Sequence, residues 1–177
     1  MWKFWLAAGV VAVATFGVVT MVGLQAVDDD EPAQAARKTS PAPALRSWAD
    51  RANKLCVTGI RDVRNVVARQ PVGDETDQQR QLRFFLETTR IEGELVAGLR
   101  KLPVKADRAK VEEAIDRFEQ EYKRDVLLGN ALRRKFDLKA LRSRITQYER
   151  EAARLRTLFG SVGADSCAAY FDPTSYG

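Results

Sequence analysis

Apolar residues recur every three or four positions along four long segments of the chain, the spacing that marks one face of an α-helix. The segments span about residues 46–70, 77–102, 107–136 and 138–159, and no strand-like alternation occurs between residues 45 and 160. Short connections between long helices place neighbours antiparallel, so we expect an all-α fold, an up-down-up-down four-helix bundle. The main alternative is a longer coiled-coil hairpin of the last two helices, projecting from a smaller base.

Local signals mark where these helices begin and end. Capping boxes are predicted at Ser47–Asp50 and Thr76–Gln79. Asp137 can cap the fourth helix, and Gly160 is expected to end it.

The fourth segment has the sharpest pattern. All seven of its heptad core positions are apolar or aromatic, which indicates a face that is packed along its whole length. These positions are Leu138, Leu141, Ile145, Tyr148, Ala152, Leu155 and Phe159. The third segment has a similar stripe, which includes Tyr122 and Val126.

A run of 24 uncharged residues, 4–27, precedes the helical segments. As a helix it would reach roughly 36 Å, enough to cross a hydrocarbon core of about 30 Å. We therefore expect residues 1–27 to form a transmembrane signal anchor. Lys3 carries the positive charge near the span and four acidic residues follow the run, so the rest of the chain is expected outside the cytoplasm.

Cleavage of this run as a signal peptide is the alternative. Signal-peptide cores are shorter, about 7–15 residues, and end at a small-residue site. The best candidate site here places the bulky Leu24 where a small side chain is needed, so the pattern favours an uncleaved anchor.

Residues 28–44 are rich in Pro and Ala and keep no apolar period, which predicts a flexible linker. Residues 45–177 then form one extracytoplasmic helical domain, the predicted four-helix bundle. The localisation that follows is a single-pass protein of the cell membrane.

Cys56 and Cys167 are the two cysteines of the chain. Outside the cytoplasm an even pair is normally a disulfide. Helix four of the predicted bundle ends beside the start of helix one, and the tail before Cys167 is long enough to turn back to Cys56. We predict a structural disulfide; two buried free thiols or a redox-active cysteine are the alternatives.

Catalytic groups are scarce in the sequence. The chain contains no His, and no Gly-rich phosphate loop, Ser elbow or Cys-x-x-Cys motif is present, so we expect no enzyme, metal site or cofactor. Neighbouring carboxylates point to different faces of their helices, which predicts solvated charge rather than a shared ligand. They are Glu92 with Glu94, Glu112 with Glu113 and Asp116, and Glu119 with Glu121.

Positive charge is concentrated in the fourth segment. Residues 133–156 contain nine basic and three acidic residues, a local net charge of +6. Arg142, Arg150 and Arg154 are the candidate basic interaction face, for phosphate, anionic lipid or an acidic protein. A solvated helix face explains the same charges, and the absence of interleaved aromatic residues argues against nucleic acid.

Several short motifs resemble those of small exported helical proteins of high-GC Gram-positive bacteria, which are lipoproteins or membrane-anchored. The motifs are residues 48–53 leading to Cys56, the Leu99–Pro103 turn, Asp137-Leu138, and Leu158–Gly160 before Cys167. The resemblance implies a helical fold and an exported location, and it transfers no functional residue. The chain differs in having an apolar anchor where such proteins often carry a lipidated Cys.

Two functions fit these observations. The first is a cell-envelope interaction or scaffold protein, which docks an envelope protein or forms a homo-oligomer through a helix face. The second is a small-ligand-binding or sensor domain, because Gly59, Gly93 and Gly129 on the apolar stripes leave room between helices. The same glycines also permit close helix crossing, which the pattern favours.

Overall fold

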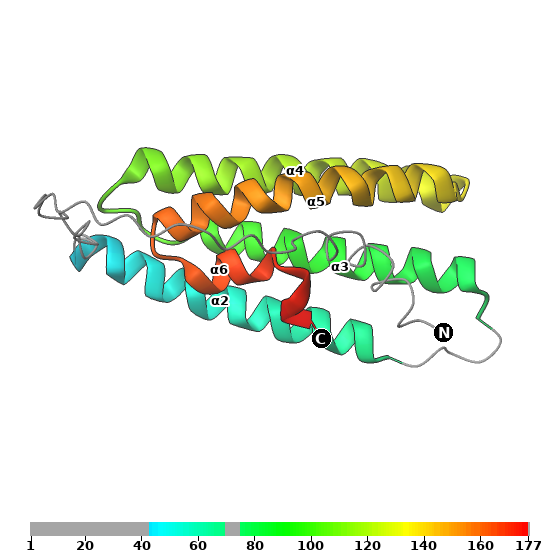
Figure 1. Ribbon diagram of the computed structural model, residues 1–177, viewed down its shortest axis with the longest axis horizontal. Helices are drawn as coiled ribbons and strands as arrows, with labels where there is room; N and C mark the ends of the chain where they lie inside the picture. The colour runs from blue at the N-terminus through cyan, green and yellow to red at the C-terminus, as the bar shows by residue number, and fades with distance from the viewer. Residues whose placement is uncertain (1–42, 70–74, 177) are drawn as a thin grey trace, which may run out of the picture. The chain divides into compact units, whose positions relative to one another are not determined.

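The computed structural model describes residues 43–69 and 75–176, and every regular element within these ranges is helical (Figure 1). Four long helices are followed by a short helix and a 3₁₀ turn, which confirms the all-α class. The elements are α2 (Pro43–Ala68), α3 (Asp77–Arg100), α4 (Arg108–Arg134), α5 (Leu138–Ser161), α6 (Asp165–Tyr170) and η1 (Pro173–Tyr176).

Among the described residues, no helix is both long enough and apolar enough to cross a membrane. The predicted anchor, residues 1–27, and the predicted linker up to residue 42 lie outside the described residues. Pro43 and Ala44 are the described part of that linker, and they form the first turn of α2. Proline fits there because the first helical residue needs no intrahelical N–H bond.

Two of the predicted helix ends need correction. Because α2 begins at Pro43, Ser47 lies inside the helix and the capping box expected at Ser47–Asp50 is wrong. Gly160 does not end α5, which continues to Ser161; the residue with a positive φ, 75°, is Gly163 in the following turn.

The other predicted caps are confirmed. The Thr76 side chain accepts a hydrogen bond from the backbone N–H of Gln79, and the Gln79 side chain accepts one from the Thr76 N–H. Asp137 accepts a hydrogen bond from the Ala140 N–H at 3.0 Å.

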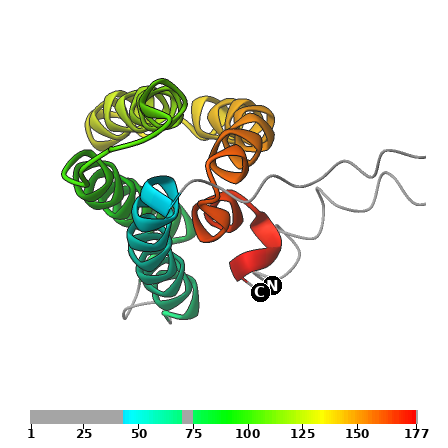
Figure 2. The same ribbon diagram turned by 90° about the vertical axis from the view of Figure 1, so that its left-hand side faces the viewer.

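The four long helices alternate in direction and pack in chain order, α2 on α3, α3 on α4 and α4 on α5 (Figure 1). The ring is not closed by α5 and α2, which make no direct backbone contact in the described residues. Instead α6 lies between them, as the end-on view in Figure 2 shows. In the predicted bundle the fourth helix ends beside the start of the first. In the structure a fifth, short helix separates these two helices.

The Cys56–Cys167 disulfide attaches α6 to α2. Its S–S distance is 2.05 Å, the two cysteines are 111 residues apart, and both are buried. Asn53 adds two polar contacts at the same joint: its amide donates to the Gly163 carbonyl at 3.3 Å, and its Oδ1 accepts from the Ser166 N–H at 2.8 Å. The predicted disulfide is confirmed.

The apolar core is densest beside this joint. Phe118 of α4 is in edge contact with Phe171, with ring centroids 4.9 Å apart, and with Phe159 of α5 at 6.3 Å. Tyr170 and Phe171 are each 3% exposed. The tail after α5 therefore covers the helices near the disulfide, as its apolar sequence predicts.

Candidate functional site

A cluster of charged side chains lies inside the helical unit, and sequence patterns did not predict it. Glu92 of α3, Glu121 and Asp125 of α4, and Arg144 of α5 are all at least nine-tenths buried, and Glu121 is fully buried. The prediction of solvated charge is therefore wrong for Glu92 and Glu121.

For the other predicted carboxylates, the solvated interpretation agrees with the structure. Glu94, Glu112, Glu113 and Asp116 are exposed, and Glu119 is half-buried. The members of each predicted group point to different sides of their helix, as expected. Glu92 from α3 and Glu121 from α4 are the two that turn into the interior.

Arg144 holds the centre of the cluster. Its Nε and Nη2 atoms donate to the two oxygens of Asp125 at 2.6 and 3.1 Å, a bidentate pair. Nη2 also donates to the Glu121 carbonyl at 3.2 Å, and Nη1 lies 2.9 Å from Glu121 Oε2 at an ion-pair distance, off the hydrogen-bond direction. The guanidinium stands 5.6 Å from the centre of the Tyr148 ring. These contacts join α4 to α5.

Glu92 supplies a third carboxyl group from α3. Its Oε2 atom is buried and accepts no hydrogen bond, while the carboxyl group faces Asp125. Burial raises the pKa of Glu92 well above its usual range, and the negative charge of Asp125 raises it further; the Tyr148 hydroxyl and Arg144 act against this. Burial also raises the pKa of Asp125, opposed by Arg144. The Glu92 and Asp125 carboxyl groups are within hydrogen-bonding reach of each other, close enough to share a proton when one is protonated.

The carboxyl groups of Glu121 and Asp125 face Arg144 at ion-pair distance. Arg124 forms a further ion pair with Glu121 at the edge of the cluster. Buried charge is tolerated when it is paired and hydrogen-bonded. The cluster is therefore a buried network of paired charges, in which burial raises the pKa of Glu92.

Three tyrosines cover the cluster on the side of the C-terminal tail. The charge of Glu92 contributes to the pKa of Tyr148, Tyr170 and Tyr176, and for all three burial is the main cause of a raised pKa. The Tyr176 hydroxyl donates to the Tyr170 carbonyl, which holds η1 against α6. Residues far apart in sequence thus lie close enough to Glu92 for its charge to affect their pKa values.

The apolar stripes are displaced beside the cluster. On α5 the side chain of Arg144 points inward, and its neighbour Ile145, a predicted core residue, is 49% exposed. On α4, Glu121 and Asp125 are buried while the predicted core residues Tyr122 and Val126 are half-buried. Beside the charged cluster, α4 and α5 therefore bury polar residues at positions next to their predicted apolar stripes.

Ile145 lies on the side of α5 that faces α6 further along the helix. Residues 138, 142, 145, 149, 152 and 156 follow one another at helical spacing. At the far end of this stripe Ala152 is buried and Arg156 forms an ion pair with Asp172, just after α6, at 3.4 Å. Among the described elements, only α4 and α6 pack with their backbones close to α5. We call the part of this side around the exposed residues Ile145 and Glu149 the uncovered α5 face.

The predicted basic residues do not form one face. Arg142, Arg150 and Arg154 are all exposed. Arg150 and Arg154 border the same shallow hollow of about 580 Å³ together with Glu151, whereas Arg142 does not line this hollow and lies on the side of α5 that bears Ile145. The candidate interaction face is therefore divided between two sides of α5.

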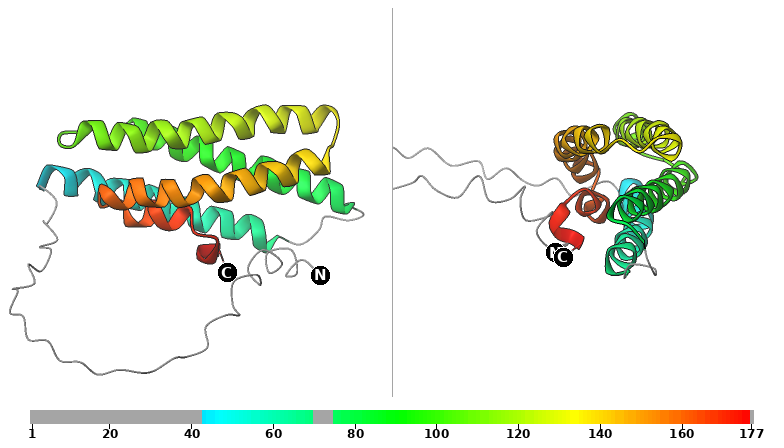
Figure 3. Two further views of the ribbon diagram at one scale, coloured as in Figure 1. Left: turned by 45° about the horizontal axis from the view of Figure 1, so that its top comes forward. Right: turned by 90° about the vertical axis from the view of Figure 1, so that its right-hand side faces the viewer.

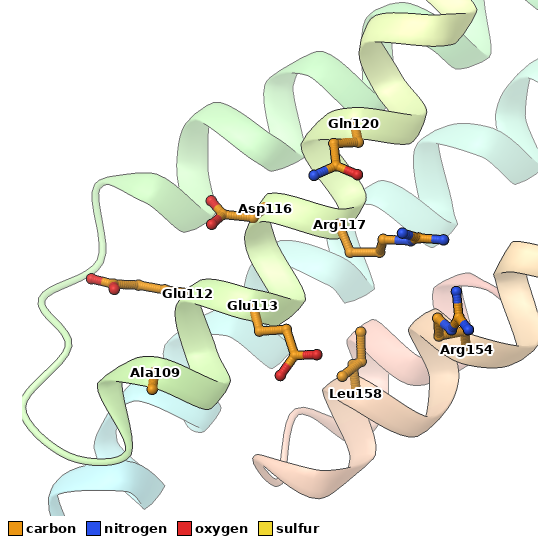
Figure 4. A pocket seen from close by; sticks show the side chains of 8 residues that line it. All are labelled: Ala109, Glu112, Glu113, Asp116, Arg117, Gln120, Arg154 and Leu158. Atoms are coloured by element: carbon orange, nitrogen blue, oxygen red, sulfur yellow. The ribbon is translucent and has the colours of Figure 1, made fainter.

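A second shallow hollow, of about 600 Å³, lies between the outer sides of α4 and α5 (Figure 4). In Figure 4 the Arg117 side chain reaches from α4 toward α5; its Nε donates to Glu151 at 3.0 Å. The lining comes from surface residues such as Glu113 and Arg154, with few apolar atoms. Such a hollow is too open and polar to enclose a small apolar ligand.

The glycines on the core stripes serve close helix crossing. A Cβ atom at Gly59 would lie 2.6 Å from Leu95, and one at Gly93 would lie 2.8 Å from the Tyr122 hydroxyl. At Gly129 the nearest atom, on Leu86, would be 2.9 Å away. These positions are filled by neighbouring side chains, which agrees with the favoured interpretation.

Within the described ranges, no group of three or more His, Cys, Asp and Glu residues is arranged to hold a metal ion. The buried carboxyl groups already have other partners: Glu121 and Asp125 pair with Arg144, and Glu92 faces Asp125. Comparisons with protein-family models, with curated proteins and with solved structures find no match to this chain.

Proposed function

We propose that this protein is a membrane-anchored, extracytoplasmic helical domain that acts as an interaction or scaffold protein of the cell envelope, with no catalytic step of its own. The disulfide supports the compartment, because such bonds persist in oxidising surroundings outside the cytoplasm. The 24-residue apolar run before the helical unit supports attachment to the membrane.

The observation that carries the interaction role is the exposure of large apolar side chains on regular helices. Leu127 of α4 is 71% exposed, Val57 of α2 is 55% exposed and Ile145 of α5 is 49% exposed. Single exposed apolar residues are common on protein surfaces, so the proposal requires that a partner covers at least one of these positions. The three residues lie on three different helices, so they offer three separate positions to test.

The alternative function, a small-ligand or sensor domain, has weaker support. Both hollows described above are shallow and lie on the outside of α4 and α5. The space beside the glycines is occupied by Leu95, Tyr122 and Leu86. No observation on the described residues favours a ligand held between the helices.

Photo-crosslinking in the native membrane tests the proposed function. A photoreactive amino acid is placed at Val57, Leu127 or Ile145 of the full chain, and at the exposed polar residues Lys110 and Gln147 as controls. We expect at least one apolar position to yield a discrete adduct of higher mass, with at least five-fold less at the controls. Adducts at no position, or equally at all five, contradict the proposal.

A further inference from the structure

The connection between α3 and α4 presents positive charge at one end of the helical unit. Its residues alternate between two sides: Leu102, Val104 and Ala106 pack against the core, and the residues between them are exposed. Lys101 and Lys105 are among the exposed ones. The packing of the three apolar side chains therefore keeps both lysines on the outside.

Further basic residues surround this connection. Arg108 and Lys110 are exposed in the first turn of α4, and Arg46 is exposed near the start of α2. The α3–α4 connection and the start of α2 lie at the same end of the helices, as Figure 1 and the left view of Figure 3 show. We call Arg46, Lys101, Lys105, Arg108 and Lys110 the basic end.

Most charges of the basic end have no internal partner. Arg108 lies 3.5 Å from Glu112 in an exposed pair, and such pairs are weak. The other four residues form no ion pair with any part of the chain that the structure describes. Between residues 101 and 110, Asp107 is the only acidic residue of the sequence. The basic end can therefore meet a negatively charged surface without first losing contacts of its own.

The chain enters the helical unit at this same end. Residues 28–42 lie between the proposed anchor and Pro43, and they can span at most about 50 Å at about 3.3 Å per residue. The opposite end is also basic, with Arg134 and Lys135 exposed, but it lies about 40 Å away along α4. Salt screens charges beyond about 10 Å, so only the end close to a membrane surface can use its charge there.

We propose that the basic end binds the anionic lipid headgroups of the membrane that anchors the chain. The inference rests on the membrane attachment of the proposed function and adds a second contact to it. Lysine and arginine donate to headgroup phosphate oxygens, and each basic residue near an anionic lipid surface strengthens binding roughly five-fold. Val57, Leu127 and Ile145 lie along the helices and stay exposed for a protein partner.

Energy transfer from a labelled residue to the bilayer tests the proposal. The full chain with Ala109→Cys is labelled with a fluorescent donor and inserted into bilayer discs with acceptor-labelled headgroups, made of phosphatidylcholine alone or mixed with phosphatidylglycerol. The introduced cysteine is the only thiol, because Cys56 and Cys167 are bonded to each other. Ala131→Cys is the matched control, since both alanines are exposed on α4 near opposite ends.

We expect phosphatidylglycerol to raise the transfer from residue 109 at least two-fold and to give no rise from residue 131. High salt should reverse the rise, because it screens the attraction.

Charge reversal then identifies the residues responsible. Lys105→Glu with Lys110→Glu is expected to lower the rise at residue 109 at least five-fold. Arg134→Glu with Lys135→Glu makes the same charge change at the opposite end and is expected to keep the rise within two-fold. All four residues are exposed, and urea unfolding checks that both double variants keep the fold.

The outcomes separate this inference from the interaction role. No rise at residue 109, an equal rise at residue 131, or an equal loss in the two double variants overturns the lipid contact, and photo-crosslinking at Val57, Leu127 and Ile145 is read independently. A lipid-dependent rise without any photo-adduct supports the basic end and contradicts the interaction role. Failure of the full chain to enter the discs overturns the membrane attachment and this inference with it.

Discussion

The two halves of the helical unit are built from the same helices but packed by different means. At the disulfide end, α6 fills the space between α5 and α2, and aromatic side chains exclude water from the core. Further along, α6 has ended, a charged network holds α3, α4 and α5 together, and Ile145 is exposed. Figure 3 shows the two sides, with α6 and η1 reaching along only part of the long helices. Because α2 and α5 do not pack on each other here, α6 closes the core between them, and α6 is much shorter than either helix.

The largest effect is expected at the closed end. Replacing both cysteines, Cys56→Ser with Cys167→Ser, removes a crosslink across 111 residues. The loop-entropy model predicts a loss of about 4–5 kcal/mol in the free energy of unfolding, measured by urea denaturation of residues 39–177. Reduction of the unmutated disulfide should give the same loss. A change below about 1 kcal/mol would show that the packing of α6 does not depend on the bond.

The charged network should be nearly as sensitive to the loss of its cation. Arg144→Met leaves the Asp125 and Glu121 carboxylates without their buried partner, and we expect a loss of about 3–5 kcal/mol. The loss should be greater at pH 8 than at pH 5, where the carboxylates can take up protons. Arg154→Met, at an exposed ion pair on the same helix, should cost less than about 1 kcal/mol. Equal costs for the two variants would contradict the role of the network.

The charged network should also make the free energy of unfolding depend on pH. Glu92 keeps its proton in the folded chain above the pH at which the unfolded chain releases it, so stability falls as pH rises from the ordinary carboxyl pKa toward the raised one. The slope is up to about 1.4 kcal/mol per pH unit for one such group. Asp125, whose pKa is also raised, adds to the same fall.

The effect of pH on stability has the opposite sign for three other carboxyl groups, those of Glu119, Glu151 and Asp172. Hydrogen bonds from Lys123 lower the pKa of Glu119, those from Arg117 lower that of Glu151, and those from Thr174 lower that of Asp172. Their contribution is present above the ordinary carboxyl pKa and is lost as pH falls through the lowered values. Stability should therefore be greatest at about pH 4–5 and decline on both sides.

Glu92→Gln tests this account directly. The amide can donate to Asp125 without a shared proton, so stability should rise at pH 8 and change little at pH 5, and the alkaline slope should become shallower. Urea unfolding between pH 4 and 9 measures both. Glu94→Gln, on the exposed side of α3, should leave the profile unchanged. An unchanged alkaline slope in Glu92→Gln would exclude a proton at this position.

The smallest effect is expected on the uncovered α5 face. Ile145→Ala should change the free energy of unfolding of residues 39–177 at low protein concentration by less than about 1 kcal/mol. Leu155→Ala, on the same helix but fully buried beside α6, should cost about 2–5 kcal/mol. Similar costs at the two positions would show that the face is covered within a single chain.

Local rules determined much of the helical architecture. The cap at Asp137 and the capping box of Thr76 and Gln79 depend on residues within one turn, and the structure has both. The disulfide also followed from the chain, because the number of cysteines and the length of the tail constrain it strongly. The anchor at residues 1–27 and the linker remain predictions.

The charged network could not be predicted from local sequence patterns. Glu92 and Arg144 stand beside Gly93 and Ile145, which fit the core period better, so the pattern assigned Gly93 and Ile145 to the core and left the charges outside. The one available signal was the spacing of Glu121 and Asp125, four residues apart on one side of α4. That spacing became informative only once Arg144 from another helix was placed opposite.

The sequence by itself determined which segments are helical, where most of them begin and which cysteines pair, because these depend on neighbours along the chain or on its length. Tertiary structure alone decided which side of each helix is covered. A charge is buried or exposed according to the partners that other helices bring to it, and α6 covers α5 only as far as Ala152. The raised pKa of Glu92 beside Asp125 and the exposure of Ile145 are both results of that packing.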